Sequence, residues 1–508
     1  MKDISTSIQK KQPKNLYVLF FSEMWERFSY YGMRALLVLY LTTSLLKGGF
    51  ELSRSQALNI YAIFTALAYL TTIFGGTLAD AILGKRKAVI IGGLLIAIGN
   101  FVLAYSVNGP GFDARYDSLI LGLGFLVIGT GFFKANVSTM VGELYKDNDP
   151  RRDSGFTMFY MGINLGGFLA PLISGLLGEV YGWAYGFISA GIGMVIGLII
   201  LIAFGKTLGS VGLGSVKRLK KISDGSLSDK CHDKLMLKDY VDIVVWSIGS
   251  IIVTYLFLRI SDWLGKGVFN TLVILIIVAS VIYMVYTIVK NTSGKTQYNR
   301  LLAILIMAVF QIVFFAGFEQ AGGTFNLFAH DNTNRLVGSF NIPATWFQSI
   351  NPFIIFLIAP AFSVIWIYLN KMGKNPSTPV KFALGLILVS AGFLVMFFAV
   401  NATQGNTVLV SPLWLVTVYL FHTVGEIFLS PIGLSLVTKL SPPKITSLIM
   451  GLWMASIALA NYVAGVLEHL LTSVSLSLFP FLTIVSLISG ILMLLLTPLI
   501  KRLMHGID

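Results

Sequence analysis

Four ionisable side chains and two tyrosines share one helical face inside an apolar segment near the start of the chain. They are Glu23, Glu26, Arg27, Tyr30, Tyr31 and Arg34, at positions i, i+3, i+4, i+7, i+8 and i+11. This spacing places side chains on one side of an α-helix. A charged side chain at the centre of a membrane-spanning helix costs about 2.5–3.5 kcal/mol. Such groups therefore face a partner or a cavity, where they bind a solute or a proton.

Three further ionisable residues interrupt apolar segments later in the chain. Lys134 lies in "GTGFFKANVS", Glu319 in "FFAGFEQAGG" and Glu426 in "HTVGEIFLSPIG". In a fold of two repeated bundles, the cations and the acids occupy equivalent positions. A cavity between the bundles would then be basic on one wall and acidic on the other. Such walls suit a zwitterion, because guanidinium and ammonium groups bind carboxylates strongly.

The same charged groups allow two other interpretations. With the cavity empty, Arg34 could pair with Glu319 and Lys134 with Glu426, so that a gate opens and closes as ion pairs break and form. Alternatively, all of them are structural ion pairs that lock helices together. His422, one turn before Glu426, is either a proton relay or a hydrogen-bonded structural histidine.

Other polar and aromatic residues on separate segments could line the cavity, or else serve helix packing and interhelical hydrogen bonding. They are Tyr69, Tyr160, Asn164, Asn351, Ser430 and Trp453. The sequence contains no cluster with metal-ligand spacing and no nucleophile–base set. We therefore expect no metal, no cofactor and no enzymatic activity.

The composition predicts the elements that position these residues. Of the 508 residues, 56% are apolar and 12% charged, whereas soluble proteins carry about 25% charged residues. Apolar runs of about 20 residues, enough to cross a bilayer as a helix, recur along the chain. We predict an all-α multi-pass membrane protein with fourteen spanning helices. Their ranges are 16–46, 55–80, 86–106, 117–144, 152–178, 183–205, 240–259, 268–289, 299–328, 344–370, 379–400, 411–439, 446–470 and 476–500.

The distribution of basic residues predicts the orientation. With the N-terminal tail in the cytoplasm, twenty-eight of the 37 lysines and arginines fall on the cytoplasmic side, six outside and three within the membrane. The positive-inside rule predicts this asymmetry. The net charge of +14 therefore indicates topology and lipid contact, not nucleic-acid binding. We expect both termini in the cytoplasm, no cleavable signal peptide and, with Cys231 the single cysteine, no intramolecular disulfide.

The longest polar linker, 206–238, separates six helices from the rest. We predict an N-terminal six-helix bundle over 1–205, a cytoplasmic linker with an inserted helix pair over 206–298, and a C-terminal six-helix bundle over 299–508. The turn "GTLADAILGKRKA" at 76–88 resembles the signature loop of the major facilitator superfamily. That resemblance implies two six-helix bundles.

Five motifs together resemble the proton-dependent oligopeptide transporters (POT/PTR), and the resemblance covers nearly the whole chain. They are the pattern E-x-x-E-R-F-x-Y-Y-G at 23–32, "GKRKA" at 84–88, "FYMGINLGG" at 159–167, "FEQAG" at 318–322 and "GEIFLSPIG" at 425–433. The segment 240–289 is similar to the two extra helices of bacterial members.

This resemblance implies proton-driven uptake of di- and tripeptides. Arg27 and Lys134 would hold the peptide carboxylate, and Glu426, Asn164 and Asn351 its amino terminus. Tyr30, Tyr31, Tyr69, Tyr160, Ser430 and Trp453 would line side-chain pockets. Arg34 and Glu319 would form a gating salt bridge, and Glu23 and Glu26, together with Glu319 and Glu426, would serve proton coupling and gating.

The chain departs from its relatives at three places. Phe315 stands where many relatives have tryptophan, which keeps an apolar pocket wall but removes an indole donor. Tyr61 and Ala62 stand where animal relatives carry a histidine, so coupling would rest on carboxylates. The loop 401–410 holds no large domain, unlike that of animal members. We expect a bacterial inner-membrane protein that is monomeric and whose partners are peptides, protons and lipids.

Three alternatives remain at this stage. The chain could carry another small anion or an amino-acid-like solute. It could be a membrane enzyme acting on acidic lipids, although no catalytic set supports this. A channel would differ by unsaturable transport without proton coupling.

Overall fold

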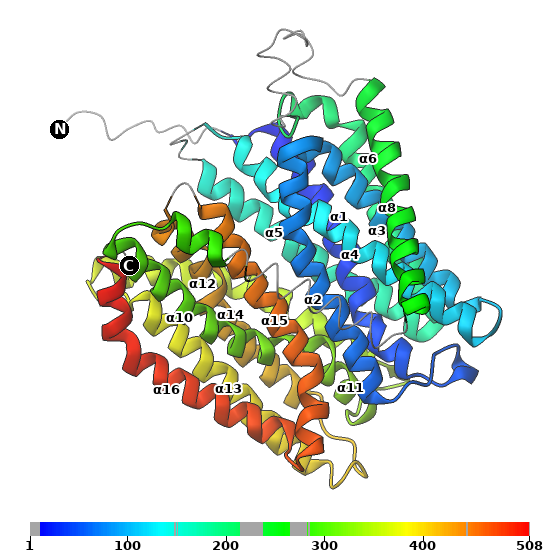
Figure 1. The fold of residues 1–508 in the computed structure, drawn as a ribbon. Coiled ribbons are helices and arrows are strands. Elements are labelled where there is room, and N and C mark those ends of the chain that lie inside the picture. Colours follow the sequence, from blue (N-terminus) through cyan, green and yellow to red (C-terminus); the bar gives the residue numbers. More distant parts are fainter. Residues whose placement is uncertain are drawn as a thin grey trace. The chain divides into compact units, whose positions relative to one another are not determined.

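The structure is a computed structural model that describes residues 11–146, 149, 151–213, 237–264, 282, 285–442 and 445–506. Figure 1 shows that the described chain is almost entirely helical. Ten of its helical stretches are long and apolar enough to cross a membrane. The prediction of an all-α multi-pass membrane protein is therefore confirmed, whereas the count of fourteen spans stays a prediction.

The helices mostly follow the predicted ranges to within a few residues, whereas α4 begins at Gly111 instead of 117. They are α1 (Lys14–Thr42), α2 (Arg54–Leu78), α3 (Lys85–Asn108), α4 (Gly111–Glu143), α5 (Arg152–Ala170), α6 (Trp183–Ala203), α8 (Leu237–Leu264), α10 (Lys295–Phe318), α11 (Thr324–Asp331), α12 (Ile350–Lys371), α13 (Thr378–Ala402), α14 (Leu413–Leu440), α15 (Thr446–Ser473) and α16 (Leu478–Met504). Most of the predicted helix 268–289 lies outside the described residues. The ten apolar spans do not include α1, which carries the ionisable residues discussed above.

The predicted helix 299–328 is broken at the residue that carries its charge. The α-helix α10 ends at Phe318, and a 3₁₀ turn over Glu319–Gly322 leads into α11. At Gly322 a Cβ atom would lie 1.9 Å from the Tyr61 hydroxyl oxygen, so only glycine allows this close approach. The break brings Gly322, three residues after Glu319, against Tyr61 of α2.

Other predicted helices also contain irregular turns, among them a π-helical turn over Ala79–Leu83 at the end of α2. Pro171 has no backbone N–H to donate, and α5 continues there as π-helical turns over Pro171–Gly175 and Leu177–Tyr181. The predicted helix 344–370 begins as a 3₁₀ helix over Ala344–Ser349, ahead of α12. A short hairpin of β1 (Leu336–Val337) and β2 (Phe340–Asn341), which the sequence pattern did not predict, precedes it.

The chain forms two compact units. The first contains residues 1–33, 71–174 and 184–254, and the second contains 34–70, 175–183 and 255–508. In the first unit α3 packs along α4; in the second, α13 packs against α14 and α16, and α10 against α15 (Figure 1). The end of α1 and most of α2 thus belong to the second unit. The predicted domain boundaries at 205 and 298 stay a prediction.

Gly166 allows α5 to approach α1 in the first unit. A Cβ atom there would lie 2.2 Å from the Met24 carbonyl oxygen and 2.9 Å from the Arg27 Cβ. We expect Gly166→Ala to force the helices apart at a cost of about 1–3 kcal/mol, which would lower the midpoint of thermal unfolding of the detergent-solubilised protein.

Gly76→Ala is the matched control for this substitution. The nearest atom to a Cβ atom at Gly76 is the Ala135 Cβ at 3.6 Å, an ordinary contact. Alanine should therefore be neutral there, or stabilising by up to about 1 kcal/mol. Equal unfolding midpoints for the two variants would contradict the close packing of α1 and α5.

Candidate functional site

Arg27 lies between two carboxylates in the interior of the first unit. Its Nε is 3.0 Å from Glu23 Oε1 and 2.5 Å from Glu26 Oε2, and all three side chains are at most 3% exposed. The guanidinium also lies 5.4 Å from the centre of the Tyr30 ring, which meets Tyr31 edge to face. The helical face predicted from the spacing is therefore formed by α1.

Lys134 adds a second positive charge to this cluster. It lies on α4, half-buried, and its charge acts on both Glu23 and Glu26. Within the described part of the chain, Glu23 Oε2 and both oxygens of Glu26 make no hydrogen bond. Buried carboxylate oxygens are normally satisfied. The two carboxylates of this cluster are therefore able to accept protons. Its cations, Arg27 and Lys134, are able to pair with the carboxylate of an incoming ligand.

The two predicted residues on α5 lie in the same unit. Asn164 is buried, and its Nδ2 donates to the Tyr160 carbonyl one turn earlier at 2.9 Å. Tyr160 is 40% exposed. The sequence motif therefore produces one fixed amide and one accessible phenol on α5.

The predicted ion pair between Arg34 and Glu319 is present in the second unit. Nη2 of Arg34 contacts Glu319 Oε2, and Nε donates to the Tyr61 hydroxyl at 2.5 Å. Glu319 is buried, and the Arg34 side chain is 11% exposed. Tyr61 is a third member that sequence reasoning missed, since no local pattern places α2 beside the broken end of α10.

Glu426 forms a polar cluster with a neighbouring helix of the second unit. The Asn351 amide on α12 donates to Glu426 Oε2 at 2.9 Å and to the Thr423 hydroxyl at 3.0 Å. Thr423 was missed, although it lies one turn before Glu426 on the same face of α14. The predicted contacts of Lys134 with Glu426 and of these residues with a peptide stay predictions.

The predicted aromatic pocket residues of the second unit pack mainly against other aromatic rings. Phe315 packs edge to face against Phe314 and Phe318, with ring centres 5.3 and 6.0 Å apart. Trp453 is buried, with its ring beside Phe382 and its carbonyl accepting from Gln311 at 3.3 Å. Tyr69 is half-buried on α2, and the side chain of Ser430 lies outside the described residues.

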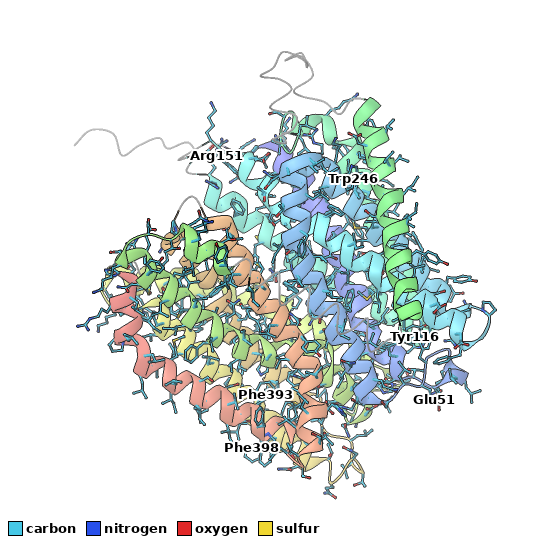
Figure 2. All side chains as sticks on the ribbon, viewed as in Figure 1. Glu51, Tyr116, Arg151, Trp246, Phe393 and Phe398 are labelled. Carbon is cyan, nitrogen blue, oxygen red and sulfur yellow. The ribbon has the colours of Figure 1, made fainter. Side chains whose placement is uncertain are left out.

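His422 is enclosed by aromatic rings. Its ring centre lies 4.8 Å from that of Phe393, labelled in Figure 2, and 5.5 Å from that of Phe325. A Cβ atom at Gly392 would lie 2.4 Å from the imidazole Cδ2, so little space remains around the ring. This environment favours a packed structural histidine over a proton relay.

Three long-range contacts of the second unit join first-half segments to second-half helices. Arg54 Nε lies 2.5 Å from Glu468 Oε1. Glu179 accepts from the backbone N–H groups of Ala344 and Thr345 at 2.9 Å each and from the Thr345 hydroxyl at 2.7 Å. The Asn326 amide donates to the carbonyl of Ala35 at 2.8 Å.

Arg335, outside the spanning helices, also contacts Glu179, at 3.6 Å. Burial lowers the pKa of Arg335, and the charges of Glu179 and Asp331 oppose this shift. The described residues contain no group of three or more histidine, cysteine or carboxylate side chains that could hold a metal ion.

Comparison with known proteins places this chain among transporters. A family model described as "POT family" matches residues 86–485. The "Peptide transporter YePEPT" of Yersinia enterocolitica is 39% identical over 503 residues, an alignment that covers 97% of this chain and 96% of the relative. The "Di-/tripeptide transporter" of Lactococcus lactis subsp. cremoris is 34% identical over 511 residues, and this alignment covers 98% of this chain and 97% of the relative. The "Uncharacterized transporter YclF" of Bacillus subtilis is 38% identical over 497 residues, covering 97% of this chain and 96% of the relative.

Solved structures agree with these relatives. A crystal structure of a peptide transporter POT in complex with sulfate is similar with a TM-score of 0.81 and 36% identity, covering 97% of this chain and 96% of the other. A POT family transporter in complex with 5-aminolevulinic acid is similar with a TM-score of 0.80 and 30% identity, covering 96% and 97%. The predicted fold class is confirmed.

Proposed function

Because this chain belongs to the POT family, we propose that it imports di- and tripeptides across a bacterial inner membrane together with protons. Members of this family are transporters, and the chain is therefore a transporter and not an enzyme. The relatives named for di- and tripeptides support the substrate class. The proposal of proton coupling rests on the buried cluster of Glu23, Glu26 and Arg27.

The proposed binding mode gives each end of the peptide its own set of residues. Arg27 and Lys134 bind the carboxylate, and Glu426, Asn351 and Asn164 bind the amino terminus. The hydrogen bond from Asn351 to Glu426 supports the second set, because it orients the carboxylate that would receive the ammonium. Side-chain pockets are assigned to Tyr30, Tyr31, Tyr69, Tyr160, Phe315, Ser430 and Trp453.

In the proposed orientation both termini lie in the cytoplasm. The ends of the spans near 42–54, 331–344 and 402–412 then face outward, which agrees with the positive-inside rule. Arg34 and Glu319 act as a gate, and their ion pair breaks as the transporter opens outward. Four carboxylates serve proton coupling: Glu23, Glu26, Glu319 and Glu426. The transporter works as a monomer surrounded by lipid.

The direct test uses the purified protein in liposomes. With a proton gradient imposed, we expect labelled dialanine to accumulate above its external concentration, with saturation and with competition by unlabelled trialanine. Without a gradient, the label should only equilibrate. Saturable transport that ignores the gradient would contradict proton coupling, and absence of saturable dialanine transport would contradict the peptide assignment.

Glu26→Gln should separate proton coupling from peptide binding. The amide keeps the size of the side chain but cannot titrate. When a peptide carboxylate engages Arg27, less positive charge is left for Glu26, which then binds a proton more readily, so peptide and proton favour each other reciprocally. We expect the variant to exchange dialanine between equal pools at nearly the wild-type rate and to lose accumulation driven by a gradient.

Both assays are run on the same liposomes, with Asp113→Asn as the control. Asp113 is an exposed carboxylate at the start of α4, outside the cluster. Full accumulation in Glu26→Gln would move coupling to another acid, and loss of exchange would assign Glu26 to binding or folding.

A second candidate substrate class is a small amino-acid-like solute. The similar structure that holds 5-aminolevulinic acid supports this alternative. That compound carries an amino group and a carboxylate, as a peptide does. If it competes with dialanine in the liposome assay and also accumulates when labelled, the range of substrates extends beyond peptides.

A further inference from the structure

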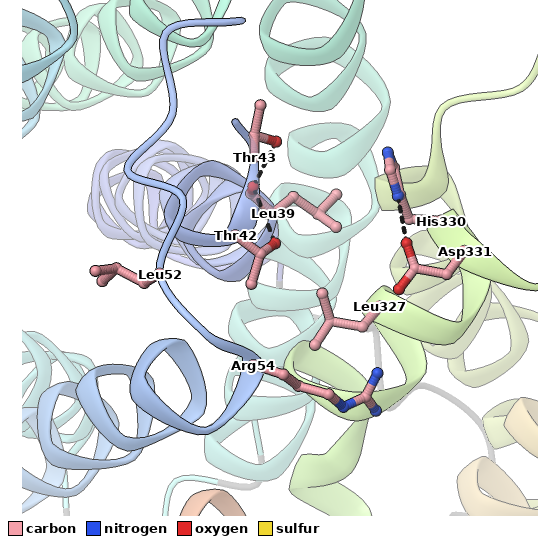
Figure 3. A pocket seen from close by; sticks show the side chains of 8 residues that line it. All are labelled: Leu39, Thr42, Thr43, Leu52, Arg54, Leu327, His330 and Asp331. Atoms are coloured by element: carbon pink, nitrogen blue, oxygen red, sulfur yellow. Dashed lines mark hydrogen bonds and ion pairs between the residues drawn. The ribbon is translucent and has the colours of Figure 1, made fainter. Parts of the chain in front are cut away.

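A small pocket lies in the second unit, between the end of α1, the start of α2 and the helix α11. It is lined by Leu39, Thr42, Thr43, Leu52, Arg54, Leu327, His330 and Asp331, and its volume is about 210 Å³. Figure 3 shows that α11 supplies one side and the end of α1 with the start of α2 the other. No residue assigned to peptide binding or coupling above lines this pocket.

The lining combines Arg54 and Asp331 with three leucines, two threonines and one histidine. Arg54 uses Nε and Nη2 toward Glu468, at 2.5 and 3.3 Å. Its Nη1 makes no hydrogen bond to any of the described residues. The N–H groups of this terminal nitrogen can therefore donate to a ligand. Asp331 uses Oδ1 toward His330 Nδ1 at 2.8 Å. Both charged side chains remain accessible, Arg54 at 39% and Asp331 at 53% exposure.

We propose that this pocket is a second subsite for small zwitterions, which takes a carboxylate at Arg54 and an ammonium at Asp331. Guanidinium–carboxylate bonds are charge-assisted and favour this orientation of the ligand over its reverse. Ligand pockets usually measure about 300–1,000 Å³, so this one accepts only the smallest peptides or one end of a longer one. The peptide class rests on the proposed function.

Occupation of the subsite would act on the link between Arg54 and Glu468. A ligand carboxylate at Arg54 competes with Glu468, which keeps the Thr324 hydroxyl as its other partner at 3.2 Å. The start of α2 would then be held less firmly to α15. In the proposed orientation the pocket faces the outside of the cell. A peptide that arrives from outside would therefore weaken the contact between Arg54 and Glu468 before it reaches the coupling residues.

The test measures ligand binding at the subsite by the NMR resonance of His330, in purified protein that carries isotope-labelled histidine. The chain has 5 histidines, and loss of one signal in His330→Gln assigns its resonance. Dialanine added at constant pH is expected to shift this resonance with a Kd of about 1–10 mM, since partly exposed charge contacts are weak. The shift should persist in Lys134→Ala, whose transport site is impaired. Dialanine blocked by N-acetylation and C-amidation should give no shift.

Asp331→Asn removes the proposed ammonium contact and is expected to weaken this binding about two- to fivefold. Glu51→Gln is the matched control, because Glu51 is an exposed carboxylate in the same connection (Figure 2) that does not line the pocket. The proposal fails if dialanine leaves the His330 resonance in place, if the blocked peptide shifts it equally, or if Asp331→Asn binds as the control does. Peptide accumulation in liposomes is measured separately, so failure of the subsite leaves the proposed function standing.

Discussion

Lys134→Ala is expected to lower the initial rate of dialanine uptake by about a hundredfold or more. The substitution removes one of the two proposed carboxylate anchors. It also leaves Glu23 and Glu26, both buried, with Arg27 as the remaining cation of the described cluster. An uncompensated buried charge costs about 3–5 kcal/mol, and each 1.4 kcal/mol corresponds to about tenfold in affinity.

The measurement compares initial uptake rates at equal amounts of reconstituted protein. Lys134→Arg keeps the positive charge and should retain part of the activity. Lys47→Ala, in the connection between α1 and α2, should behave as wild type. Uptake by Lys134→Ala at the wild-type rate would remove Lys134 from the binding site.

Exchanging the charges of Arg34 and Glu319 should give the second large effect. Arg34→Glu alone places two carboxylates in contact, and Glu319→Arg alone places two guanidinium groups in contact. Each single substitution leaves buried charges unpaired and is expected to lower uptake by about a hundredfold. The double variant restores an ion pair with reversed polarity, and the Tyr61 hydroxyl can donate to a carboxylate as well as accept from a guanidinium.

We therefore expect the double variant to recover a measurable part of the uptake, because a double-substitution comparison isolates the pair. Tyr61→Phe keeps both charges and removes only the hydroxyl, so it should reduce uptake less than either charge reversal. A double variant no better than the worse single variant would show that the two residues act independently.

The helices and the ionisable residues within them could be predicted because both depend on local sequence. Apolar length sets the bounds of a span, and α3, α13 and α16 match their predicted ranges closely. The spacing from Glu23 to Arg34 determines one helical face. The pairing of Arg34 with Glu319 followed from opposite charges at equivalent positions of the two halves.

Contacts between distant segments could not be predicted in this way. The break after Phe318 depends on how closely Gly322 approaches Tyr61, which lies on another helix. Two partners of Glu179 are backbone amides about 165 residues away, and no side-chain pattern marks these two. The hairpin Leu336–Asn341 is too short to show an alternating pattern.

The contact of Glu179 with main-chain amides has an evolutionary consequence. A carboxylate that binds N–H groups accepts almost any residue at the positions that supply them. Ala344 is fully buried, so it can change to another small residue without loss of this contact, whereas proline at 344 or 345 would delete a donor. Glu179, in contrast, tolerates few replacements. Across descendants of this chain we expect position 179 to vary slowly and position 344 to vary among small residues, with proline excluded from it.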